Sequence, residues 1–284
     1  MPESGLTVKD LVGLSEPACK LIDAIRITTG VLFEPTRIRR KAKADADAAI
    51  VGAKADLQIR DLERRAFDRI KHREARRQEN IENIVGGATH QLPPDSTAKS
   101  LDEDWASEFM NHCQDIGDEQ MQQVWSRILA GEFVSPGKYS LRTLNFVKLL
   151  SKKDAEVFSQ FCSFLWFTGQ ELAYLKTKKT EEFLTANGFP YASLLHLESL
   201  GLINMEMTLA ITFNAPKAML HYYGQPYVFT FPEETKQPSV SCVCLTNMGK
   251  ELTGLCSSQP SFGYVAALTE SLLADQKCVV SLCK

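Results

Sequence analysis

The chain has 284 residues, of which 44% are hydrophobic, and a formal net charge of −3 at pH 7. This length is enough for one large domain or two modest ones, and the apolar content is ordinary for a soluble protein. Because no stretch reaches the roughly 20 apolar residues of a membrane span, the sequence predicts no transmembrane helix.

The N-terminus and the cysteines both indicate a cytoplasmic protein. Glu3 comes early, and no basic segment followed by an apolar core is present, so we expect no signal peptide. The eight cysteines form no C-x-x-C pair, and the spacing of Cys242 and Cys244 is not that of a zinc knuckle. We therefore expect reduced, mostly buried thiols and neither a metal nor another cofactor.

Residues 1–35 are predicted to form short amphipathic helices. Ser15 is a suitable N-cap, Pro17 fits the first turn of a helix, and Pro35 ends the segment. The apolar face either packs on the body of the protein or, together with the basic cluster that follows, lies on an anionic membrane surface. In the second case residues 6–43 would be the anchor, and the protein would be peripheral at the inner membrane.

Residues 36–85 are predicted to form one long basic helix. From Arg37 to Val85 the sequence holds no proline and a single glycine, Gly52, and it is rich in good helix formers. Such a helix would be roughly 70 Å long at 1.5 Å per residue. It has few large apolar residues, so we expect it to project from the body and to be stabilised by another copy, a partner protein or an anionic surface.

A short apolar seam is expected along the long helix. Its members recur at steps of three and four residues, which is the spacing of a coiled coil: Ile59, Leu62, Ala66 and Ile70. The seam predicts self-association, and hence a homo-oligomer.

The long helix also carries most of the positive charge. From Arg37 to Arg77 the chain has 14 Lys and Arg against 7 Asp and Glu, a net of +7, which leaves −10 for the remainder. The basic side chains are expected to contact a polyanion or an acidic protein surface. The candidate contact residues are Arg37, Arg39, Arg40, Lys41, Lys43, Arg64, Arg65, Arg69, Arg73, Arg76 and Arg77.

The glycine pair at residues 86 and 87 is predicted to end the long helix. The sequence GGATHQLPPDSTAKS that begins there is rich in turn-forming residues, so residues 86–100 are predicted to be a linker. We expect the main domain boundary of the chain to lie in this linker.

Residues 101–170 are predicted to form a bundle of four short helices. Asp102, Asp118 and Ser151 are suitable helix starts, and Gly131 is expected to end the second helix. Apolar residues follow each start at helical spacing, so the tryptophans and phenylalanines of this block are interpreted as core.

Residues 171–284 are predicted to form a winged-helix-like α+β domain. The order is a helix, the motif L-x-x-L-G-L-I, β-rich runs at 209–213, 227–231 and 240–245, and the motif L-T-x-x-G-x-E-L. Between residues 186 and 256 three lysines stand against five glutamates, a net of −2. DNA binding depends on neutralising phosphates, so this domain is expected to contact protein.

Several segments resemble a bacterial family that is catalogued only as a domain of unknown function. They are LSEPACKLIDAI, RIRRKAKADADA, RRQENIENIV, DEDW, DEQMQQVWSRILAGE, SLRTL and LSKKDAEVF, and the likeness extends over nearly the whole chain. The central block is also similar to the abortive-infection alpha-type family of phage-defence proteins. The matching residues are Asp118, Glu119, Trp125, Leu129, Ala130, Leu150, Ser151, Asp154 and Ala155. The resemblance implies a role in bacterial defence against phage and supplies no catalytic residues.

No catalytic motif is found in the sequence. It has no glycine-rich phosphate loop, no H-E-x-x-H and no G-x-S-x-G, and its five histidines are not at metal-ligand spacing. We therefore predict no catalytic, cofactor-binding or metal-ligating residues.

The sequence as a whole predicts a mainly α protein with a smaller α+β part. The leading hypothesis is a non-enzymatic scaffold or sensor, in anti-phage defence, that acts through self-association and contacts with a partner protein. One alternative is a nucleic-acid-binding module that uses the basic helix at residues 37–77. The other is the membrane-surface effector anchored by residues 6–43.

Overall fold

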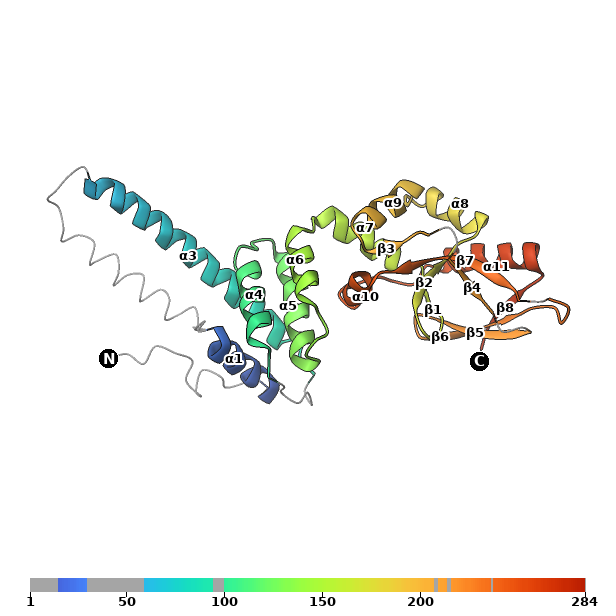
Figure 1. Ribbon diagram of the computed structural model, residues 1–284, viewed down its shortest axis with the longest axis horizontal. Helices are drawn as coiled ribbons and strands as arrows, with labels where there is room; N and C mark the ends of the chain where they lie inside the picture. Colours follow the sequence, from blue (N-terminus) through green and yellow to red (C-terminus); the bar gives the residue numbers. More distant parts are fainter. Residues whose placement is uncertain are drawn as a thin grey trace. The chain divides into compact units, whose positions relative to one another are not determined.

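The protein has a mixed α+β fold. The computed structural model describes residues 15–29, 59–93, 100–206, 209–213, 216–235 and 237–283. Within these residues there are ten helices and an antiparallel sheet of eight strands. The chain divides into two compact units, residues 1–148 and residues 149–284 (Figure 1).

The described part of the first unit is helical. Its helices are α1 (Glu16–Thr29), α3 (Ile59–Thr89), α4 (Glu103–Cys113), α5 (Glu119–Val134) and α6 (Leu141–Leu149). Two of the predicted helix starts are confirmed, because the side chains of Asp102 and Asp118 accept hydrogen bonds from the backbone N–H groups of Trp105 and Met121. Each cap satisfies an N–H group that has no partner within its own helix.

Helix α1 buries its apolar face within the first unit. The buried residues are Pro17, Ala18, Leu21, Ile22 and Ile25. The helix packs against α4 and α3, so its apolar side is occupied by protein. This arrangement corresponds to the first of the two alternatives for residues 1–35. The rest of the predicted anchor, apart from residues 15–29, lies outside the described residues.

Aromatic side chains form the centre of the first unit. Trp105 stacks on Phe109 with ring centroids 5.1 Å apart, and Phe109 meets the edge of Trp125 at 5.3 Å. The indole nitrogen of Trp105 donates to the carbonyl oxygen of Tyr139 at 2.7 Å, which ties α4 to the turn before α6. These rings are core, as their helical spacing predicts.

The predicted end of the long helix at Gly86-Gly87 is wrong. Helix α3 continues through both glycines to Thr89. The reason is a close approach to α5, since a Cβ atom on Gly87 would lie 2.5 Å from the hydroxyl oxygen of Ser126. That hydroxyl is bonded to the carbonyl oxygens of Ile84 and Gln122, at 2.9 and 2.8 Å. Gly87 is therefore a packing residue, and tertiary contact overrides the usual tendency of glycine to end a helix.

The predicted end of α5 at Gly131 is also wrong, because the helix runs on to Val134. A Cβ atom on Gly131 would lie 2.8 Å from the ring of Tyr139, which is fully buried. The neighbouring carboxylate of Glu132 accepts the backbone N–H groups of Gly137 and Tyr139, at 2.5 and 2.9 Å. This carboxylate holds the chain that follows α5 against the helix. The helix therefore ends three residues later than Gly131 suggests.

The second unit combines helices with the sheet. Its helices are α7 (Lys152–Cys162), α8 (Lys178–Ala186), α9 (Tyr191–Ser199), α10 (Asn247–Thr253) and α11 (Phe262–Gln276). Its strands are β1 (Leu165–Phe167), β2 (Leu172–Leu175), β3 (Ile203–Asn204), β4 (Ala210–Thr212), β5 (Lys217–Tyr222), β6 (Gln225–Thr230), β7 (Ser239–Leu245) and β8 (Val279–Leu282). Helix α7, which the sequence groups with the bundle at 101–170, belongs to this unit.

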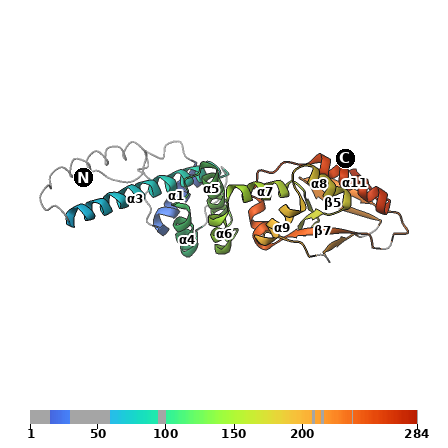
Figure 2. The same ribbon diagram turned by 90° about the horizontal axis from the view of Figure 1, so that it is seen from above.

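The sheet is antiparallel throughout. Its strand order is β3-β7-β2-β1-β5-β6-β8, and β4 pairs with β7 outside this path. Helices α8 and α11 pack beside each other (Figures 1 and 2). The hydroxyl of Tyr264 on α11 reaches the backbone of Leu175 on β2. The helix and the sheet thus share one core.

The winged-helix expectation for residues 171–284 is not confirmed. The predicted strands belong to a larger sheet, in which β4 pairs with β7 and β6 pairs with β5 and β8. Strand β1 begins at Leu165, within the block 101–170 that the sequence predicted to be a helical bundle. The cause is Trp166, which is fully buried against the rings of Tyr222 and Phe229 at 4.8 and 5.6 Å.

The two motifs that suggested a winged helix do meet in space. The hydroxyl of Thr246 donates to the carbonyl oxygen of Gly201 at 2.6 Å, and it also caps α10. A Cβ atom on Gly249 would lie 2.1 Å from the carbonyl oxygen of Leu202. The small residue of L-T-x-x-G-x-E-L therefore allows α10 to contact the backbone of L-x-x-L-G-L-I.

The contact between α3 and α5 predicts opposite effects for the two adjacent glycines. Gly87→Ala forces Ser126 to rotate and lose its two hydrogen bonds, so we expect a loss of about 1–3 kcal/mol in the free energy of unfolding. Gly86→Ala is the matched control, because no atom lies within 4 Å of its added methyl group. It should leave stability unchanged or raise it by about 0.5–1 kcal/mol. Urea denaturation followed by circular dichroism measures both, and equal effects would contradict the packing role of Gly87.

Candidate interaction surface on helix α3

Helix α3 has two different halves. Towards its C-terminus Ile81, Ile84, Val85 and Ala88 are buried against the other helices of the first unit. From residue 62 to residue 76 almost every described side chain is exposed. Figure 2 shows the first turns of the helix extending beyond α4 and α5. One helix thus serves as core at one end and as surface at the other.

The predicted seam lies in the exposed half. Leu62 and Ile70 are 65% and 45% exposed, Ala66 is half-buried, and the side chain of Ile59 lies outside the described residues. Phe67, which lies beside these residues, is 60% exposed. It is not part of the predicted seam, because it follows Ala66 directly and so falls outside the spacing of three and four residues. We call Leu62, Ala66, Phe67 and Ile70 the apolar stripe. Large apolar side chains gathered in this way on a surface typically mark an interaction site.

The apolar stripe continues the buried face of the same helix. At 3.6 residues per turn, Ala66, Ile70, Ile81, Ile84 and Ala88 fall within an arc of about 60°. The side of α3 that packs on α4 and α5 is therefore the side that is exposed further towards its N-terminus. A continuous apolar side is typical of a helix that is covered along its whole length.

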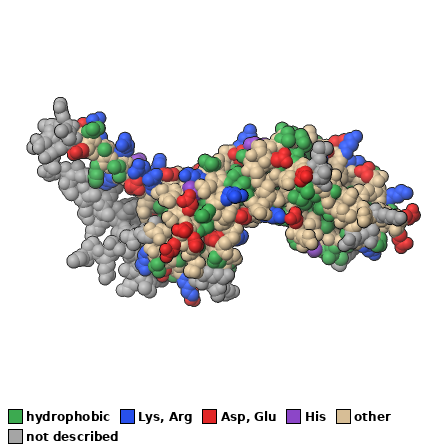
Figure 3. All heavy atoms as spheres, in the orientation of Figure 1, with side chains coloured by type: hydrophobic (Ala, Val, Ile, Leu, Met, Phe, Trp, Pro, Cys, Tyr) green, Lys and Arg blue, Asp and Glu red, His purple; other side chains and the backbone are tan. Residues whose placement is uncertain are grey.

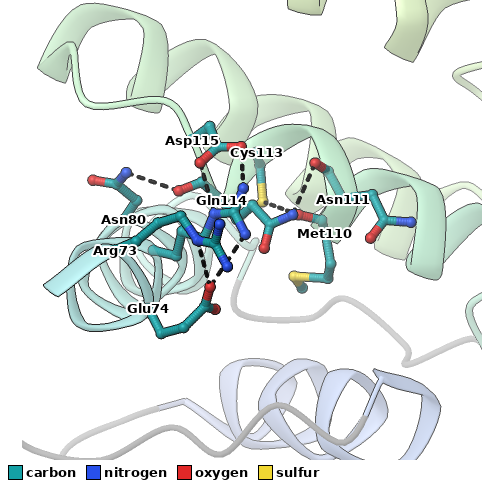
Figure 4. A network of polar contacts seen from close by, with 9 residues as sticks. Arg73, Glu74, Asn80, Met110, Asn111, Cys113, Gln114 and Asp115 are labelled. Atoms are coloured by element: carbon teal, nitrogen blue, oxygen red, sulfur yellow. Dashed lines mark hydrogen bonds and ion pairs between the residues drawn. The ribbon is translucent and has the colours of Figure 1, made fainter. Parts of the chain in front are cut away.

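An ion pair marks the point where the buried half begins. The guanidinium of Arg77 donates two parallel hydrogen bonds to the carboxylate of Asp115, at 2.8 and 2.9 Å, and a longer one of 3.3 Å to Glu74. Three residues further along α3, the side-chain amide of Asn80 donates to the carbonyl oxygen of Gln114 at 2.8 Å (Figure 4). The hydrogen bonds from Arg77 hold the pKa of Asp115 below its usual value.

Most of the described basic candidates are engaged in ion pairs. Arg64 and Arg65 both reach Asp61, and Arg73 and Arg77 both reach Glu74. The other two described candidates, Arg69 and Arg76, are exposed. The remaining candidates lie outside the described residues: Arg37, Arg39, Arg40, Lys41 and Lys43.

Both signs of charge lie beside the apolar stripe. By the helical repeat, Arg65, Arg69 and Arg76 lie to one side of Ala66 and Ile70, and Glu63 and Glu74 on the other side are accompanied by Arg64 and Lys71. Figure 3 shows basic and hydrophobic side chains next to each other along this part of α3. Between residues 61 and 79 seven basic residues stand against five acidic ones, a net of +2. The surface is thus amphipathic and carries both signs of charge, rather than being uniformly basic.

One cluster in the second unit has the residue types of a hydrolase site without its geometry. The hydroxyl of Ser151 donates to one oxygen of Asp154 at 2.6 Å, and the Nε2 atom of His196 lies 2.6 Å from the other. The carboxylate thus stands between the serine and the histidine, whereas a nucleophilic serine needs a base on its own hydroxyl. Ser151 and Asp154 form the capping box of α7, and His196 joins this helix to α9.

The described residues contain no cluster of metal ligands. Among them, no three His, Cys, Asp or Glu side chains are close enough to hold a metal ion. All eight cysteines are free thiols, and burial raises the pKa of Cys242 to about 12 and that of Cys278 to about 11. These thiols are therefore protonated at neutral pH.

The pair formed by Arg77 and Asp115 predicts a pH-dependent stability. A carboxyl group with a lowered pKa stabilises the fold above its unfolded pKa of about 4 and loses this contribution as pH falls through the folded value. Asp115→Asn should therefore lower the thermal midpoint at pH 7, and its difference from the parent should fade below about pH 4. Thermal denaturation at several pH values measures this, and a difference that is independent of pH would contradict the role of the ion pair.

Comparison with known proteins assigns the chain to a protein family. No curated protein and no solved structure matches the chain. In the described part of the chain, none of the helices combines the length and the hydropathy that crossing a bilayer requires. A family model does match, over residues 64–269, which takes in most of α3 and nearly all of the second unit. The chain therefore belongs to the family described as "Protein of unknown function (DUF2806)".

Proposed function

We propose that this protein is a non-enzymatic scaffold that assembles through α3. The apolar stripe of one copy would pack against the same stripe of a second copy. The observation that supports this most directly is the exposure of Leu62, Phe67 and Ile70 on the side of α3 that is buried further along. Burial of such side chains contributes roughly 25 cal/mol for each Å² removed from water.

The short length of the stripe predicts a weak contact. Stable interfaces bury roughly 1,200–2,000 Å² in total, and four side chains over about two and a half helical turns supply only part of this area. We therefore expect association to depend on protein concentration.

The nucleic-acid alternative has less support from the described residues. Arg64, Arg65, Arg73 and Arg77 already face carboxylates, so binding a phosphate would require these ion pairs to open. A protein surface that presents both signs of charge suits this helix better. The proposed role in phage defence rests on the resemblance of the central helices to abortive-infection proteins. The geometry of α3 neither supports nor opposes this role.

A charge placed in the stripe tests self-association. Leu62→Glu together with Ile70→Glu should abolish concentration-dependent association, because the carboxylates would be buried between two apolar faces. Both positions are exposed, so the fold should be retained. Light scattering coupled to size-exclusion chromatography, over a range of loading concentrations, measures the mass.

Ala75→Glu is the matched control for this experiment. Ala75 is exposed and lies half a turn around the helix from Ala66, away from the stripe. The Ala75→Glu variant should associate as the parent protein does. If the stripe variant and the control have the same mass as the parent at every concentration, the stripe is not the contact. A mass that changes on adding DNA at low salt, and returns at high salt, would support the nucleic-acid alternative instead.

A further inference from the structure

The second unit contains a cavity that the proposed assembly does not use. It has a volume of about 310 Å³ and lies beside the turn between β5 and β6. The apolar part of its lining comes from β1 and β2, and polar side chains line the remainder. The lining includes Leu165, Phe167, Leu172, His221, Tyr223 and Ser258.

The turn that forms one wall of the cavity has a strained residue. Tyr223 and Gly224 connect β5 to β6, and their φ angles are +49° and +75°. Two positive φ angles define a type I′ turn, in which Asn, Asp or Gly is usual at the first position. A bulky side chain in this conformation is an outlier, and such outliers concentrate at functional sites.

Contacts of the Tyr223 side chain show what maintains this conformation. Its hydroxyl donates to the hydroxyl oxygen of Ser258 at 2.6 Å, and its ring meets the ring of Tyr222 edge-on at 5.1 Å. These contacts join the turn to the loop that follows α10. The strained residue therefore closes one side of the cavity.

Two polar side chains can bind a ligand inside the cavity. Because the hydroxyl oxygen of Ser258 accepts a hydrogen bond from Tyr223, the hydroxyl hydrogen of Ser258 can be donated to a ligand. His221 is half-buried, and its ring lies 6.3 Å from that of Phe167. Neutral imidazole carries one nitrogen that accepts a hydrogen bond. The cavity thus offers one donor and one acceptor beside an apolar floor.

The size of the cavity limits which ligands can fit. A cavity of about 150 Å³ lined by apolar side chains holds one benzene ring. The volume here is about twice as large and is open to solvent on one side, so two fused rings can enter. Phe167 supplies an aromatic surface, on which flat rings pack well.

We propose that this cavity binds a planar bicyclic heteroaromatic molecule, whose ring N–H donates to His221 and whose ring nitrogen accepts from Ser258. The apolar side of the molecule lies against Phe167 and Leu172. This class includes fused nitrogen heterocycles of the size of a nucleobase.

Titration calorimetry with the full chain and benzimidazole tests the proposal. Benzimidazole has two fused rings, one N–H donor and one nitrogen acceptor. We expect saturable binding, weakened at least about fivefold by His221→Ala and by Ser258→Ala. Indene has the same shape and no nitrogen, so its binding should be weak and unaffected by either substitution.

Met219→Ala is the matched control variant. Met219 is on the same strand as His221, is 55% exposed and does not line the cavity, so benzimidazole should bind this variant as it binds the parent. Tyr223→Phe keeps the ring and removes only the hydroxyl that orients Ser258, and it should weaken binding even if another variant unfolds. Absence of saturable binding by the parent, or equal affinity in the His221 and Ser258 variants, would overturn the proposal.

Discussion

The close approach of α3 to α5 is the constraint on which the first unit depends. Gly87 leaves no side chain between the two helices, so the hydroxyl of Ser126 reaches the backbone of α3. The amide of Gln122, one turn earlier on α5, donates to the side chain of Asn80 at 3.2 Å. These polar contacts are buried and satisfied, and buried hydrogen bonds of this kind fix one register between helices. With its C-terminal half held in this way, α3 carries its N-terminal half outside the bundle.

The exposed half of α3 owes its stability to that anchor. Isolated helices of this length are marginal in water, and the ion pairs between Asp61 and its arginine neighbours add only a few tenths of a kcal/mol each. Continuity with a buried segment removes the cost of nucleation. The pairing of Arg77 with Asp115 adds a charged contact at the edge of the core. A rigid, amphipathic rod that starts from a packed core is a suitable device for joining protein copies.

Local features of the fold could be predicted from the sequence, and features set by distant contacts could not. Asp102, Asp118 and Ser151 are caps, because a cap depends on the next three residues alone. The i,i+4 pairing of Asp61 with Arg65 was predictable for the same reason. Arg77 and Asp115 are 38 residues apart, and nothing in the spacing joins them. Gly87 and Gly131 misled the prediction, because burial against other elements overrides the local preference of glycine.

Sedimentation equilibrium of the unmodified protein measures the central claim most directly. The monomer mass is 31.7 kDa. If α3 joins copies through its apolar stripe, the weight-average mass should rise from this value towards a multiple of it as the concentration increases through the micromolar range. A mass that stays at the monomer value up to about 100 μM, where contacts of roughly 5 kcal/mol or more would already be populated, would contradict assembly through α3.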